Sequence, residues 1–129
     1  MAAFLTPEWL HLLDDAAHAV AAPAGLAPGH VLVLGQEVHG APGGTVRYQV
    51  ALDADGVRVL TTADGRADLT FVCDYETAAA LARGVTNAQA ALMEGALRLR
   101  GDVERLAAAR DALVTIGDVF ARVREATEF

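Results

Sequence analysis

The sequence predicts a single α+β domain, in which a five-stranded, largely antiparallel sheet is covered on one face by helices. Two observations indicate this fold class. Apolar residues recur at helical spacing near both ends of the chain, whereas the middle alternates between apolar and polar residues and is interrupted by glycine-rich turns. At 129 residues, the chain suits one compact domain, residues 1–129, and is short for two.

The first predicted helix begins after Thr6. The Thr6 side chain can cap its start, and Pro7 has the backbone angle that suits a first helical position. Four apolar residues then recur at helical spacing: Leu10, Leu13, Ala17 and Val20. Pro23 and Gly25 predict the end of this amphipathic helix.

Four strands are predicted next, and we expect them to form an antiparallel meander with one polar face. Short apolar or alternating runs place them at residues 31–34, 46–52, 57–60 and 68–72. Turn residues separate them: a cluster rich in glycine and proline at 40–44, and Asp-Gly pairs at 55–56 and 64–65.

Two short helices are predicted after these strands. Asp74 is placed to cap the first, which runs through Leu81 and has Gly84 at its left-handed end. The second begins with the spacing of a capping box and ends at a glycine: Thr86, Gln89 and Gly95.

A fifth strand and a last helix complete the expected order. Residues 96–100 alternate between apolar and polar side chains, as a strand does. Asp102 can cap the last helix, whose apolar stripe is Leu106, Ala109, Leu113, Ile116, Phe120 and Val123.

The charge of the chain argues against two classes of partner. The formal net charge is −7, and all 10 basic residues are arginines. Such a surface repels phosphate backbones and anionic headgroups, so we expect neither nucleic-acid binding nor docking through a polybasic patch. No apolar run reaches the ~20 residues of a spanning helix, and residues 1–5 lack the features of a signal peptide. We therefore expect a soluble chain without stable membrane insertion.

Few residues offer catalytic or metal-binding chemistry. Asp14 and His18 lie four apart on the first helix and could share a metal, but without a third ligand an exposed pair is favoured. Cys73, the only cysteine, follows a strand, where a buried thiol is expected rather than a nucleophile. Asp53 and Asp55 resemble a calcium loop whose further ligand positions hold valines, so they predict a hairpin turn. We expect no enzyme activity, no cofactor and no metal, and the single cysteine fits a reducing cytoplasm.

Three short segments occur in a recognisable order. They are ADLT at 67–70, LARG at 81–84 with NAQAALM at 87–93, and EGALRLRGD at 94–102. In order and spacing they resemble the A-D-x-T, L-x-x-G…N-P-Q-x-A and G-K-L-K-x-x-G-D patterns of the sterol carrier (nonspecific lipid-transfer) domain family. The chain departs from these patterns at Ala88, where many members have proline, and at Ala96, where lysine is common.

The resemblance implies an apolar tunnel between the sheet and the helices. Family members bind sterols, fatty acids, fatty acyl-CoA or phospholipids, often with little selectivity. We therefore expect noncatalytic binding or transfer of such a ligand. Because the Ser-Lys-Leu ending of peroxisomal members is absent, we also expect a bacterial cytoplasmic location. The alternative is a module of the same fold, with no occupied cavity, that forms a homodimer or contacts an enzyme partner. A third hypothesis, an enzyme of lipid metabolism, rests on Asp14, His18 and Cys73.

The family pattern also implies which residues meet the ligand. Four lie on a helix next to it: Asn87, Gln89, Leu92 and Met93. Gln89 could orient a polar group of the ligand, or serve only as the capping partner of Thr86. Two leucines of the fifth strand either line the cavity or pack in the core: Leu97 and Leu99. Three residues of the last helix either close the tunnel or pack in the core or a dimer interface: Leu113, Ile116 and Phe120. Phe71 completes the predicted ligand-binding set.

Overall fold

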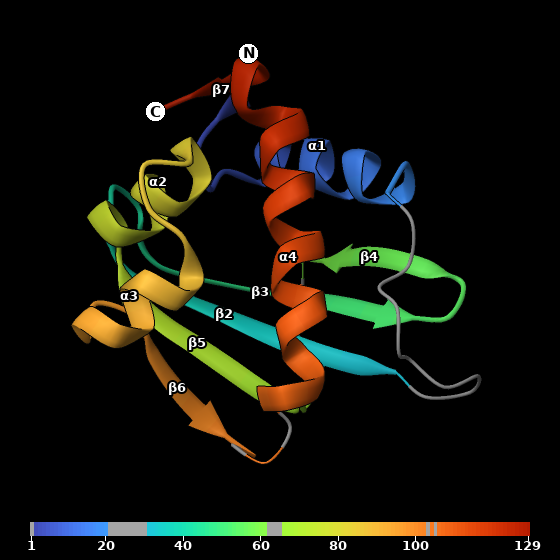
Figure 1. Cartoon of the computed structure of the whole chain (residues 1–129). Coiled ribbons are helices and arrows are strands. Elements are labelled where there is room, and N and C mark those ends of the chain that lie inside the picture. The colour runs from blue at the N-terminus through green and yellow to red at the C-terminus, as the bar shows by residue number, and fades with distance from the viewer. Residues whose placement is uncertain (1, 21–30, 62–65, 103, 105) are drawn as a thin grey trace.

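The computed structural model describes residues 2–20, 31–61, 66–102, 104 and 106–129 of the chain. A five-stranded sheet forms one layer, and helices cover one of its faces (Figure 1). The predicted α+β fold class is confirmed. A separate pair of short parallel strands, β1 (Ala2–Ala3) and β7 (Thr127–Glu128), joins the two ends of the chain, which the sequence did not indicate.

Helix α1 (Pro7–His18) begins where the sequence predicts. The hydroxyl of Thr6 accepts a hydrogen bond from the backbone N–H of Trp9, and the predicted apolar face is buried. The prediction that Val20 belongs to the helix is wrong. After His18 the backbone hydrogen bonds span three residues instead of four, as in the bond from the Val20 N–H to the Ala17 carbonyl. Val20 packs on the core beyond the helix end. The predicted end signals at 23 and 25 lie outside the described residues.

The strands of the main sheet are in the order β4-β3-β2-β5-β6. Their bounds are β2 (Leu32–Ala41), β3 (Gly44–Asp53), β4 (Gly56–Leu60), β5 (Leu69–Asp74) and β6 (Arg98–Gly101). The hairpin turns predicted before β3 and before β4 are both present. Strand β2 is longer than predicted because its pairing with β3 and β5 continues beyond Leu34. Glu37, inside it, forms ion pairs with Arg47 and Arg100.

The predicted meander is wrong at its fourth strand. β5 does not continue the antiparallel series beside β4; it lies parallel to β2, on the far side of the first hairpin, which makes the sheet mixed. Alternation assigns a strand's faces but not its neighbour. The pairing begins at Asp68, whose backbone N–H donates to the carbonyl of Val33 at 2.8 Å. Its carboxylate accepts from the Val33 N–H, also at 2.8 Å. The Asp-Gly turn predicted at 64–65 lies outside the described residues.

Two helices follow β5. Helix α2 (Tyr75–Arg83) has the predicted cap, Asp74, and ends at Gly84 with φ 78°. Helix α3 (Ala88–Glu94) ends at Gly95, also with φ 78°. The predicted capping box is wrong: the side chain of Asn87, rather than that of Thr86, accepts from the Ala90 N–H at 2.9 Å. Asparagine caps at least as well as threonine, so the adjacent residue takes the position.

Helix α4 (Leu106–Val123) crosses in front of the sheet in Figure 1 and continues into a short 3-10 turn, η2 (Arg124–Ala126). The Asp102 side chain accepts a hydrogen bond from the Glu104 N–H, as a capping aspartate does, just ahead of the helix. Five described residues of α4 are buried: Ala112, Thr115, Ile116, Val119 and Val123. Leu113 and Phe120 are partly buried, and the side chains of Leu106 and Ala109 lie outside the described part of the chain.

The core lies between the sheet and the helices. Trp9 has no exposed surface, and its ring makes edge-to-face contacts with Phe4 and Tyr48 and stacks beside Phe120. Among the described residues, no helix is long and apolar enough to cross a membrane.

Candidate functional site

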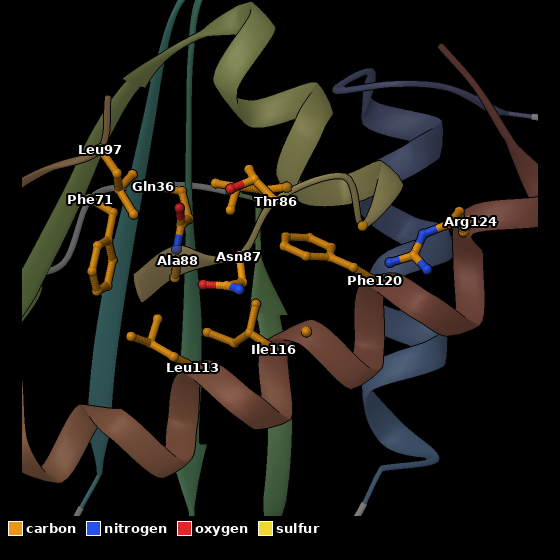
Figure 2. A pocket seen from close by; sticks show the side chains of 13 residues that line it. Gln36, Phe71, Thr86, Asn87, Ala88, Leu97, Leu113, Ile116, Phe120 and Arg124 are labelled. Atoms are coloured by element: carbon orange, nitrogen blue, oxygen red, sulfur yellow. The ribbon is translucent and has the colours of Figure 1, made fainter. Parts of the chain in front are cut away.

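A cavity of about 380 Å³ lies between the sheet, the α2–α3 connection and α4. The sheet side provides Gln36, Phe71 and Leu97. The α2–α3 connection and its flanking turns provide Leu81, Gly84, Thr86, Asn87 and Ala88. Helix α4 and the turn after it provide Leu113, Ile116, Gly117, Phe120 and Arg124 (Figure 2). The lining is therefore mostly apolar, with neutral polar groups and one charged side chain.

The sheet side of the cavity follows from strand register. Gln36 of β2 is paired with Phe71 of β5, so both side chains lie on the face that the helices cover. Phe71 is 1% exposed, and Leu97 is also buried. Gln36 places a neutral amide beside these two apolar side chains (Figure 2).

Small residues leave the space open. Ala88 at the start of α3 and Gly117 on α4 face the cavity from two walls. A Cβ atom added at Gly117 would meet nothing within 4 Å. Larger residues at these two positions would occupy volume that the protein leaves empty.

The charged residue, Arg124, is held in place by the end of α2. Its Nε–H donates to the carbonyl of Ala82 at 2.8 Å, which satisfies one of the carbonyls that a helix end leaves unpaired. The guanidinium lies against Gly84, where an added Cβ would come within 2.9 Å of the guanidinium carbon. Glycine suits that position because its φ is positive, and a Cβ there would make the guanidinium shift.

The structure brings six of the ten predicted ligand-binding residues to the cavity: Phe71, Asn87, Leu97, Leu113, Ile116 and Phe120. The other four do not line it. Gln89 and Met93 are exposed, Met93 by 89%. Leu92 and Leu99 are partly buried against the core. Whether any of the ten contacts a ligand stays a prediction.

Sequence reasoning missed several lining residues, among them Gln36 and Arg124. A polar residue at an inward position of β2 was the available signal for Gln36. Arg124 follows the last helix, and no local pattern distinguishes it from the other arginines.

The residues considered for catalysis are engaged elsewhere in the fold. Asp14 accepts a hydrogen bond from the Val59 N–H at 2.8 Å, which joins α1 to β4, and the ring Nδ1 of His18 lies 2.7 Å from the Asp14 carbonyl. Burial raises the pKa of the Cys73 thiol to about 11, so it is protonated at neutral pH. Asp53 accepts from two N–H groups of the β3–β4 turn, as the hairpin interpretation predicts. No group of three potential metal ligands occurs in the described part of the chain.

One further carboxylate is strongly perturbed, on the opposite face of the sheet. Glu37 is hydrogen-bonded by Arg47 and His39 and paired with Arg100, and these partners lower its pKa to about 2. A carboxylate held ionised in this way is a poor proton donor at neutral pH. Its lowered pKa indicates a structural ion-pair cluster.

Comparison with protein families identifies the SCP-2 sterol transfer family, whose model matches residues 14–113. The chain belongs to this family. The recognition made from residues 67–102 is confirmed, and membership supports lipid or sterol binding in general terms. Comparison with curated proteins gives no match.

Solved structures agree on the fold of this sterol-transfer-family chain. A crystal structure of sterol carrier protein 2 is 20% identical, with a TM-score of 0.70, and the match covers 91% of this chain and 96% of that one. A hypothetical protein from Thermus thermophilus, described as a candidate sterol carrier, is 18% identical, with a TM-score of 0.67 and coverage of 98% and 91%. The solution structure of palmitated SCP2L2 from Aedes aegypti is 21% identical, with a TM-score of 0.59 and coverage of 86% and 94%.

Proposed function

We propose that this member of the SCP-2 family binds and transfers a hydrophobic ligand in the cavity beneath α4, without catalysing a reaction on it. The observation that carries the proposal is the open volume of about 380 Å³ between buried Phe71 and Leu97 and the inner face of α4. Small-molecule sites usually occupy about 300–1,000 Å³ and are mostly apolar, with few polar groups.

The size of the cavity favours a ligand with one acyl chain over a phospholipid with two, because the volume lies near the lower end of that range. Burial of about 400 Å² of apolar ligand surface would contribute about 10 kcal/mol before association costs. That gain supports micromolar affinity without any catalytic group. The palmitated state of the Aedes aegypti relative is consistent with this ligand class.

The noncatalytic part of the proposal is supported by what the candidate groups do. Asp14 joins α1 to β4, Cys73 is buried with a raised pKa, and Glu37 is held ionised on the other face of the sheet. None of these three side chains lines the cavity.

We also propose that residues 1–129 form one ligand-binding domain that works in a bacterial cytoplasm without a cofactor, as its single cysteine and acidic charge favour.

The test is a cavity-filling variant compared with an exposed control. Gly117 lines the cavity and an added Cβ there meets nothing within 4 Å, so we expect the ring of Gly117→Phe to occupy cavity space. Val114→Phe enlarges a residue of the same helix that is 67% exposed. Displacement of a fluorescent fatty acid should be saturable for the unchanged protein and for Val114→Phe, and should weaken at least tenfold for Gly117→Phe. Native mass spectrometry of each protein reports any lipid that copurifies. No saturable binding and no retained lipid in the unchanged protein would count against the proposal.

The alternative, an interaction module that self-associates or meets an enzyme partner, is favoured by the exposed apolar side chains of Val85, Met93 and Val114, which are 77%, 89% and 67% exposed. Exposed apolar side chains of this size are common at interfaces when they form one patch. Light scattering distinguishes the two functions. A stable homodimer in which all three residues are protected, together with an empty cavity, would favour the module.

A further inference from the structure

The cavity carries one charge at one end. Figure 2 shows Arg124 at one end of the pocket, and Phe71 and Leu97 at the opposite end. The other polar side chains of the lining, Gln36, Thr86 and Asn87, are neutral. The described lining therefore has a single cation and no carboxylate.

The charge of Arg124 is not neutralised by a partner among the described residues. Its described hydrogen bond uses Nε and a neutral carbonyl, that of Ala82. None of the ion pairs between described residues includes Arg124. Another arginine, Arg83, stacks over the Phe129 ring at 4.8 Å and does not line the cavity. The two terminal nitrogens of Arg124 remain to donate to a ligand.

The side chain is also fixed in position. The bond to Ala82 and the contact with Gly84 hold the half-buried guanidinium at the edge of the cavity. A fixed guanidinium recognises a carboxylate through two parallel N–H···O bonds, which a neutral hydroxyl cannot form. Partial burial beside Phe120 strengthens such a pair relative to one in water.

We propose that Arg124 makes this cavity selective for single-chain amphiphiles with an anionic head, whose carboxylate binds the guanidinium while the chain extends toward Phe71 and Leu97. The inference rests on the proposed function and deepens it by naming the ligand class and the residue that selects it. A neutral alcohol of the same chain length would fill the same apolar space but lose the charged contact.

The experiment compares laurate with lauryl alcohol in the unchanged protein and in Arg124→Gln. The unchanged protein should bind laurate more tightly. In Arg124→Gln, laurate binding should weaken roughly tenfold, the change in Kd that about 1.4 kcal/mol produces, while alcohol binding stays the same. Retained alcohol binding shows that the variant is folded with its cavity intact. The matched control is Arg122→Gln, which removes the same charge from an exposed residue of α4 outside this cavity.

Each other outcome overturns the inference. Equal affinities for acid and alcohol in the unchanged protein mean that no charge selection exists. A preference for laurate that survives in Arg124→Gln, or that is lost equally in Arg122→Gln, assigns the selection elsewhere. Loss of both ligands in Arg124→Gln makes the residue structural. If lauryl alcohol binds but laurate does not, the inference fails while the proposed function stands, whereas failure of both ligands to bind the unchanged protein overturns the proposed function itself.

Discussion

The indole N–H of Trp9 donates to the hydroxyl of Thr127 at 3.0 Å, and the Thr127 hydroxyl donates in turn to the Val123 carbonyl at 2.7 Å. This buried pair joins the first helix to the last residues of the chain. Next to it, β1 and β7 pair in parallel. The two ends of the chain are therefore held together by side chains as well as by backbone.

Replacing Thr127 by valine should destabilise the fold. The valine matches threonine in shape but cannot accept the indole N–H, which then stays buried without a partner, at a cost of about 1–3 kcal/mol. Urea unfolding followed by Trp9 fluorescence measures the change. Thr127→Ser keeps the hydroxyl and should retain more of the stability. Equal stabilities for the serine and valine variants would contradict an energetic role for this bond.

Glu37 should make the stability of the protein depend on acid pH. Its pKa is lowered from 4.5 to about 2, with Arg47 as the first cause and His39 next. Because the folded pKa is the lower one, the ionised carboxylate stabilises the fold above pH 4.5, and that contribution is lost as the pH falls from 4.5 toward 2. Unfolding midpoints measured across this window should fall more steeply for the unchanged protein than for Glu37→Gln.

Glu37→Gln should also lower stability at neutral pH, by about 1–3 kcal/mol, because it removes hydrogen bonds made to a charged group. Asp55→Asn, at an exposed turn residue, is the control and should leave the pH profile unchanged. Parallel pH profiles for the unchanged protein and Glu37→Gln would show that Glu37 is not the titrating group.

Local physics explains which parts of the fold could be predicted. The caps at Thr6 and Asp74 and the helix ends at Gly84 and Gly95 depend on a few consecutive residues, and all four predictions are correct. The place of β5 depends on a contact between distant residues, Asp68 and Val33, which no local pattern encodes. The sequence therefore predicted the elements and missed their order in the sheet.

In the candidate site, too, the sequence predicts the helix but not which of its residues face the cavity. In α3, Ala88 faces the cavity, and Ala91, one turn on, is buried. Gln89 and Met93 are four residues apart and share the exposed side. A resemblance supplies the positions of a motif but not the direction in which each side chain points. The sequence therefore predicts Gln89 and Met93 at the ligand, whereas both side chains are exposed. Arg124 lies in η2, beyond the end of α4, and still lines the cavity, a placement that no local pattern encodes.

Asp14 should act as a structural tie rather than as a metal ligand. Its carboxylate accepts the Val59 N–H at 2.8 Å, so Asp14→Ala leaves a strand N–H without that partner and should cost about 1–2 kcal/mol. The control is Asp15→Ala, an exposed neighbour of the same charge. Thermal unfolding with and without added Zn²⁺ checks both interpretations. Stabilisation by zinc that disappears in Asp14→Ala would revive the metal hypothesis for Asp14 and His18.

Gly84 and Gly95 allow the contact with Arg124 to be separated from backbone strain. Both glycines end a helix with φ 78°, so alanine at either position should cost about 1–2 kcal/mol for the left-handed conformation. At Gly95 an added Cβ meets nothing within 4 Å, whereas at Gly84 it comes within 2.9 Å of the Arg124 guanidinium. Gly84→Ala should therefore lose more stability than Gly95→Ala in urea unfolding, and it alone should weaken the binding of an anionic lipid by displacing Arg124. If the two variants lose the same stability and bind laurate equally, the position of Arg124 does not depend on the absence of a side chain at residue 84.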